Sequence, residues 1–79
     1  MQMKPIQYES VVNECTLALE VHPRFSRALF RRARAYEAMG RLELAMQDVQ
    51  ALLQVDANHQ DGLELVKRLR LSLVKKKDA

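Results

Sequence analysis

The stretch from Asn13 to Asp56, NECTLALEVHPRFSRALFRRARAYEAMGRLELAMQDVQALLQVD, decides the fold. Its apolar residues recur three and four positions apart, which is the spacing of the buried face of a helix. Pro23 and Gly40 interrupt that pattern, and glycine just past a last turn readily takes the left-handed conformation that ends a helix. Nothing in the chain alternates apolar and polar residues with period two. The stretch therefore predicts helices joined by short turns, and no strands.

The chain also matches itself at an offset of about 34 residues. Leu19 falls on Leu53, Val21 on Val55 and Leu29 on Leu63, and the likeness is one of residue class more than of identity. The apolar stripe between Pro23 and Gly40 consists of Phe25, Ala28, Leu29, Ala33 and Tyr36. Similar stripes precede and follow it. We predict an all-α fold of four short antiparallel helices, in which the first copy of the repeat is incomplete.

Length and composition restrict the class of protein further. The 79 residues suffice for one small domain, and 48% of them are apolar, which excludes a disordered chain. Cys15 is the single cysteine, so we expect a reducing compartment and a cytoplasmic location. It lies on an apolar stripe, which predicts a buried structural thiol. We expect no signal peptide and no membrane span, because no apolar run is long enough.

Positive charge is concentrated in one segment. Six of the 13 basic residues lie between Arg24 and Arg41, with one acid among them. Arg24, Arg27, Arg31 and Arg34 fall within about 80° on a helical wheel, opposite the apolar stripe. Their mutual repulsion predicts a counter-charge, either acids of neighbouring helices such as Glu14, Glu43 and Asp48 or an external anion. We expect Arg32 to lay its stem over the core with its head in water.

The same stretch resembles tetratricopeptide repeats. The positions that carry the resemblance are Leu29, Ala33, Tyr36, Gly40, Ala45, Val49 and Leu52. It implies a partial domain over residues 1–74: the second helix of one repeat at 6–22, a full repeat at 24–57 and a capping helix at 58–74. Residues 75–79 form a basic tail or the start of a linker. The run from Met1 to Gln50 looks like the end of this domain in plant proteins that add a C-terminal Phox/Bem-type domain.

The resemblance also implies a function. In the chaperone-adaptor subclass, two basic residues four apart hold the terminal carboxylate of a chaperone tail, and Arg27 and Arg31 match those positions. It implies a protein-binding co-chaperone whose partner is the acidic C-terminal peptide of a heat-shock protein 70 or 90, with Arg34 and Arg24 as further peptide-binding residues. The clamp's lysine and two asparagines have no counterpart here. Asp61 and Leu65, 34 residues on, do not continue the clamp.

Other functions have weaker support in the sequence. His22 and His59 lie in turns without metal-ligand spacing, so we expect no metal, no cofactor and no catalysis. A scaffold with a merely solvated arginine face stays open, as does a homo-oligomer through the exposed face of the first helix. We expect that face to include Ile6, Val12, Thr16 and Leu19. A phosphate binder for RNA or a phosphopeptide is less favoured because few aromatic residues are free to stack on bases. We expect no membrane partner.

Overall fold

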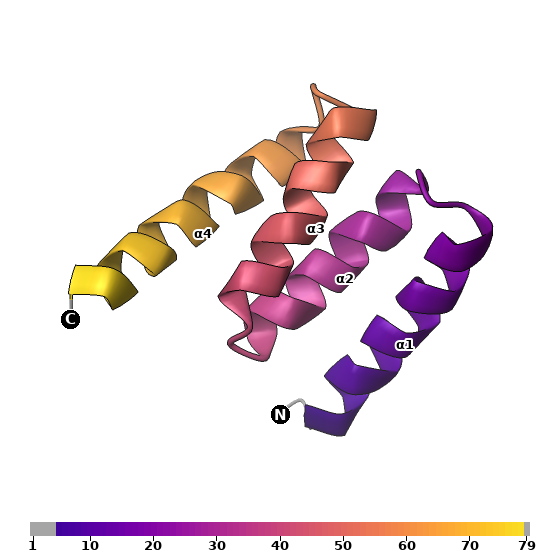
Figure 1. The fold of residues 1–79 in the computed structure, drawn as a ribbon, viewed down its shortest axis with the longest axis horizontal. Coiled ribbons are helices and arrows are strands. Elements are labelled where there is room, and N and C mark those ends of the chain that lie inside the picture. The colour runs from indigo at the N-terminus through magenta and orange to yellow at the C-terminus, as the bar shows by residue number, and fades with distance from the viewer. Residues whose placement is uncertain (1–4, 79) are drawn as a thin grey trace.

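The computed structural model describes residues 5–78, and the side chains of residues 7–74. Its four helices are α1 (Pro5–Val21), α2 (Ser26–Ala38), α3 (Leu42–Val55) and α4 (Gln60–Asp78). Each helix runs antiparallel to its neighbour and packs against the next one in chain order (Figure 1). The described residues contain no strand. The predicted all-α fold of four successive antiparallel helices is confirmed.

The core lies where α2, α3 and α4 meet. Its largest fully buried side chains are Leu52, Leu65, Leu69 and Val49. Ala33 of α2 and Ala45 of α3 are completely buried as well, so the two helices approach each other over small residues. Leu65 is a core residue that the sequence did not predict. It lies 34 residues after Arg31, in the position equivalent to that clamp arginine, and it packs in the core.

Two glycines shape the helix ends. Gly40 has φ +82°, and the N–H of Arg41 behind it donates to the Tyr36 carbonyl at 2.9 Å, which closes α2 as predicted. Gly62 lies in the first turn of α4, where its N–H donates to Nδ1 of His59 at 2.9 Å. A Cβ at Gly62 would lie 2.8 Å from the buried Leu52 side chain. His59 therefore caps α4, and Gly62 lets α4 approach α3.

Three expectations about the helices need correction. Arg24 lies in the turn after Pro23, and Phe25 precedes the first residue of α2 and is 42% exposed. Both were assigned to the helix because its period was extended backwards past its start, and Phe25 is therefore no core residue. At the C-terminal end of the chain, the capping helix α4 continues to Asp78, whereas the sequence predicted its end at residue 74. Lysine is a good helix former, and no glycine or proline interrupts these residues.

The predicted exposed face of α1 is also wrong in part. Thr16 accepts a hydrogen bond from Arg32 of α2, and Leu19 packs against the core. Val12 is half-buried, while the Ile6 side chain lies outside the described ones. Among the described residues of α1, the exposed large apolar side chains are Leu17 and Val21, both more than 60% accessible. An apolar surface does exist on α1, but it lies on another side of the helix from the predicted one.

Candidate functional site

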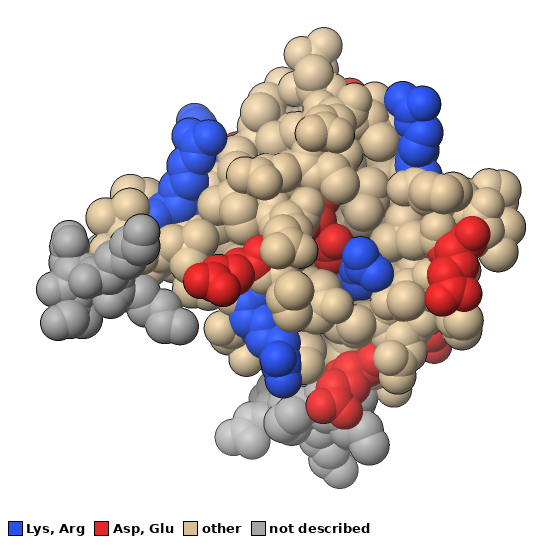
Figure 2. Space-filling view, viewed as in Figure 1, with Lys and Arg blue, Asp and Glu red and all other residues tan. Residues whose placement is uncertain are grey.

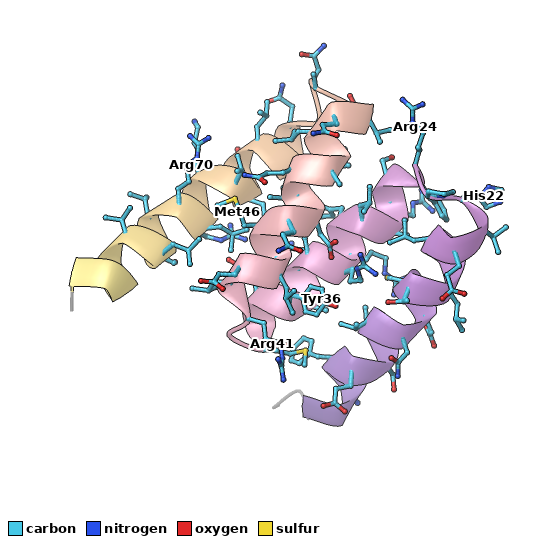
Figure 3. The ribbon with its side chains drawn as sticks, viewed as in Figure 1. His22, Arg24, Tyr36, Arg41, Met46 and Arg70 are labelled. Atoms are coloured by element: carbon cyan, nitrogen blue, oxygen red, sulfur yellow. The ribbon has the colours of Figure 1, made fainter. Side chains whose placement is uncertain are left out.

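Arginines of α2 form the candidate site. Arg27, Arg31 and Arg34 are all exposed. They lie three and four residues apart and so follow one side of the helix over about 10 Å. Arg24 is exposed in the turn before α2, beside His22 (Figure 3). The structure thus brings three of the four predicted residues together on α2 and places the fourth beyond the helix start.

The predicted counter-charges do not pair with these arginines. Within residues 7–74, no carboxylate oxygen lies within 4.0 Å of the side-chain nitrogens of Arg24, Arg27 or Arg31. Among the same residues, Arg34 has one acidic neighbour: Oε1 of Glu37 lies 3.9 Å from its Nε. The guanidinium groups of Arg27 and Arg31 therefore keep their hydrogen-bond donors for solvent or for a ligand.

Arg32 pairs with Asp48, one of the acids predicted to neutralise the exposed arginines of α2. Its Nε and Nη2 donate to Oδ2 and Oδ1 of Asp48 at 2.7 and 2.8 Å, and its Nη1 donates to Oγ1 of Thr16 at 3.0 Å. The hydrogen bonds to Asp48 raise the pKa of the Arg32 guanidinium above its usual value. The expected placement of its head in water is wrong, because a bidentate partner on α3 lies within reach.

A small apolar hollow lies beside Arg27 and Arg31. Its other lining residues are Glu14, Cys15, Ala18, Phe25 and Ala28. Cys15 is buried, as predicted, and this burial raises the pKa of its thiol, partly countered by the positive charges of Arg31 and Arg32. Phe25, which sequence reasoning placed in the core, instead borders the arginines and adds apolar surface next to them.

The capping helix adds a cation that sequence reasoning missed. Nε and Nη2 of Arg68 donate to Oε2 and Oε1 of Glu37 at 2.7 and 3.0 Å, which joins α4 to α2. The hydrogen bonds to Glu37 raise the pKa of Arg68. Arg34 also lies over the ring of Phe30, 5.8 Å from its centroid. Glu37 is the one acid between Arg24 and Arg41, and a single acid among so many arginines was the sequence feature that could have indicated an ion pair with Arg68.

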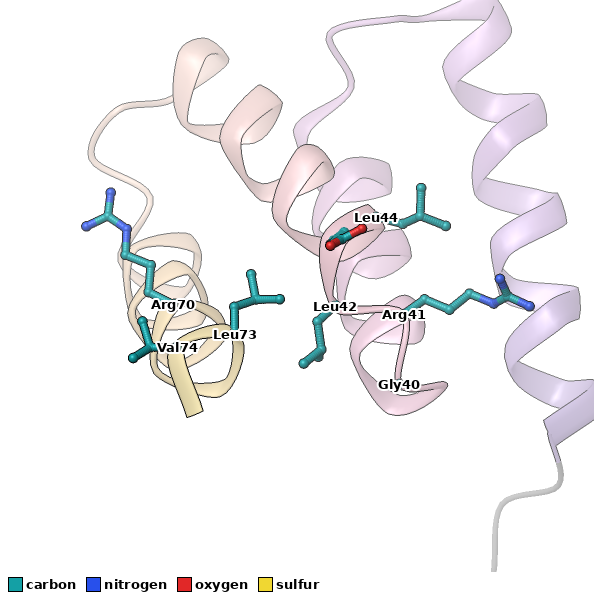
Figure 4. A pocket seen from close by; sticks show the side chains of 8 residues that line it. Gly40, Arg41, Leu42, Leu44, Arg70, Leu73 and Val74 are labelled. Atoms are coloured by element: carbon teal, nitrogen blue, oxygen red, sulfur yellow. The ribbon is translucent and has the colours of Figure 1, made fainter. Parts of the chain in front are cut away.

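One face of the molecule carries charges of both signs. On the face seen in Figure 2, basic and acidic side chains are scattered, with no continuous basic area. A hollow between the start of α3 and the C-terminal part of α4 is lined by Leu42, Leu73 and Arg70. Leu42 and Leu73 point toward each other, whereas the Arg70 side chain extends away from them (Figure 4). Residues 5–78 contain no cluster of histidine, cysteine and acidic residues that could hold a metal ion. None of the helices described there is long and apolar enough to span a membrane.

Curated relatives match along most of the chain. Protein PHOX1 of Arabidopsis thaliana is 42% identical over 76 residues, which are 96% of this chain and 10% of that protein. HSP-interacting protein of Zea mays is 40% identical over 73 residues, 92% of this chain and 10% of that protein. Sperm-associated antigen 1A of Danio rerio is 38% identical over 63 residues, 80% of this chain and 15% of that protein. The chain therefore spans only a small part of the length of these relatives.

No protein-family model and no solved structure matches the chain. Two other findings define the class of protein. The chain repeats at about 34 residues as pairs of antiparallel helices, and its relatives contain tetratricopeptide repeats. The chain is a tetratricopeptide-repeat chain. It resembles the PHOX proteins of plants, which confirms the resemblance found in its sequence.

Proposed function

We propose that this chain is a protein-interaction module that binds the acidic C-terminal tail of a heat-shock protein 70 or 90 chaperone. In this proposal Arg27 and Arg31 act as half of a carboxylate clamp. Arg34 adds a third positive charge on α2, and Arg24 contributes charge from the turn. The module acts as a co-chaperone or adaptor and catalyses no reaction.

One observation carries the proposal: Arg27 and Arg31 lie one helical turn apart, exposed, with no ion pair among the described residues. A guanidinium offers a planar fork of donors that matches a carboxylate, and it stays charged at physiological pH. The apolar hollow beside the two arginines would receive the side chain next to that carboxylate. The name of the maize relative, HSP-interacting protein, agrees with a chaperone as the partner.

The affinity follows from the number of contacts. Each hydrogen bond to a charged group contributes about 1.5 to 3 kcal/mol. Two such contacts give a dissociation constant near one millimolar. The test is an NMR titration of the chain with an acidic peptide that has a free terminal carboxylate, with the same peptide amidated, and with a short single-stranded RNA. We expect the free acid to shift the resonances of α2, and we expect the amidated peptide to bind about tenfold more weakly. Equal affinity for acid and amide contradicts the clamp, and tighter binding of the RNA supports a phosphate binder.

A second candidate function is self-association, and exposed apolar side chains favour it. Leu17 and Val21 are exposed on α1, and Leu71 and Val74 on α4. Leu17 and Val21 lie about one helical turn apart, as do Leu71 and Val74, and exposed apolar side chains that lie together mark interaction surfaces. In this reading the chain is a scaffold, and its arginines are merely solvated. Sedimentation at millimolar concentration tests it: Leu17→Glu should shift an associated chain toward the monomer, and a monomeric profile of the unsubstituted chain contradicts it.

A further inference from the structure

Glu37 holds two arginines from different helices at the edge of the candidate site. Its carboxylate accepts both hydrogen bonds from Arg68 of α4, and Arg34 of its own helix approaches it to 3.9 Å. The Glu37 side chain is 22% exposed, whereas those of Arg34 and Arg68 are more than half exposed. Two accessible cations thus share one partly covered acid, and the group carries a net positive charge.

This group continues the line of Arg27 and Arg31. Arg31, Arg34 and Glu37 line one hollow, whose apolar walls come from Tyr8 and Val11 of α1 and from Phe30 of α2. Along α2, Arg34 lies seven residues from Arg27, which is about 10 Å at 1.5 Å per residue. An extended peptide covers about 3.3 Å per residue. A ligand whose terminal carboxylate lies at Arg27 and Arg31 therefore brings a side chain two or three residues earlier beside Arg34, which shares Glu37 with Arg68.

We propose that Arg68, which reaches the candidate site through its contact with Glu37, is a specificity-determining residue of that site: it binds an acidic side chain two or three residues before the ligand's terminal carboxylate, and Glu37 is the internal carboxylate that competes for it. This inference rests on the proposed function. Arg68 has five N–H donors and Glu37 uses two of them, so a ligand carboxylate finds donors on Arg68 before Glu37 is displaced.

Competition, and not support, is the expected role of Glu37. An exposed arginine–carboxylate pair contributes little to the fold, so its loss leaves α4 in place. Its negative charge, however, cancels part of the positive potential that an acidic ligand meets. Removing that charge should strengthen binding of acidic peptides, and the gain should shrink at high salt because exposed charges are screened.

The test uses three peptides with free or blocked acids. One has a terminal carboxylate and a glutamate two or three residues before it, the second has glutamine in place of that glutamate, and the third has the glutamate with an amidated terminus. NMR titration of the unsubstituted chain should give about a threefold preference for the first peptide over the second. Arg68→Gln should remove that preference. Glu37→Gln should raise affinity for the first peptide about threefold and leave the second nearly unchanged.

Arg70→Gln is the matched control. It removes the same charge from the same helix, but Arg70 points about 200° away from Arg68 and lines the hollow on the other side of α4. It should preserve the preference. Arg68→Lys, which keeps the charge but loses the fork, should retain part of it, and melting curves check that each variant is folded.

The two proposals can fail separately. If Arg68→Gln keeps the full preference for the glutamate peptide, or Glu37→Gln leaves its affinity unchanged, the inference about Arg68 and Glu37 is overturned. The carboxylate clamp then still stands as long as the unsubstituted chain distinguishes free acid from amide. If it does not distinguish them, the clamp itself is wrong.

Discussion

The Arg32 guanidinium and the Asp48 carboxylate form a two-point ion pair between α2 and α3, with both nitrogen–oxygen distances at or below 2.8 Å. The third contact of Arg32, to Thr16, reaches α1, so one side chain connects three helices. Arg31 is the preceding residue on the same helix and points about 100° away. By fixing the rotation of α2, the pair keeps Arg31 directed away from the core, on the exposed side of the helix that also carries Arg27 and Arg34.

Asp48→Asn should therefore destabilise the whole domain. The side chains of Arg32 and Asp48 are only 20% and 8% exposed, so the substitution leaves a guanidinium poorly solvated and without its charged partner. Because Arg32 keeps some contact with water, we expect a loss of about 2 kcal/mol in unfolding free energy. Thermal melting followed by circular dichroism should show a midpoint lower by roughly 10 °C.

Glu20→Gln serves as the control for this prediction, because Glu20 is exposed on α1 and has no ion pair among the described residues. Its midpoint should stay within the change expected of a surface substitution, about 0.5 kcal/mol. Equal effects of Asp48→Asn and Glu20→Gln would mean that the pair with Arg32 does not hold the helices together.

Ala33→Leu should separate α2 from α3. Ala33 has no exposed surface, and the added side chain must displace neighbours that include fully buried residues of α3 and α4. Overpacking of this kind costs about 1 to 3 kcal/mol. Ala38→Leu makes the same change at an exposed position of the same helix and should have little effect. Urea unfolding compares the two, and similar midpoints would show that the assigned face of α2 is wrong.

Cys15 should react slowly while the chain is folded. Its side chain is buried, and burial raises the pKa of the thiol, so near pH 8 less of the reactive thiolate is present than in an unfolded chain. Labelling with a disulfide reagent should be at least about tenfold slower in buffer than in urea. The rate should climb as the pH rises toward the raised pKa. Equal rates in buffer and urea would place Cys15 at the surface.

The sequence was sufficient for the fold because its signals are local and periodic. Ala33, Ala45 and Gly40 occupy the positions that the spacing predicted, since each depends on its place in one helix. The site was predicted less completely. Arg68 and Glu37 are 31 residues apart in the sequence, and no periodic pattern connects them. Phe25 was misplaced because a helical wheel does not show where its helix begins.

The most direct test of the carboxylate clamp combines a protein change with a ligand change. An NMR titration compares the free-acid and amidated forms of one acidic peptide on the unsubstituted chain, on Arg31→Gln and on Arg24→Gln, which removes the same charge from the turn before α2. The clamp predicts that the unsubstituted chain and Arg24→Gln prefer the free acid about tenfold, whereas Arg31→Gln binds both forms equally weakly, since the lost interaction is the one to the terminal carboxylate. A full preference for the free acid in Arg31→Gln would contradict the clamp.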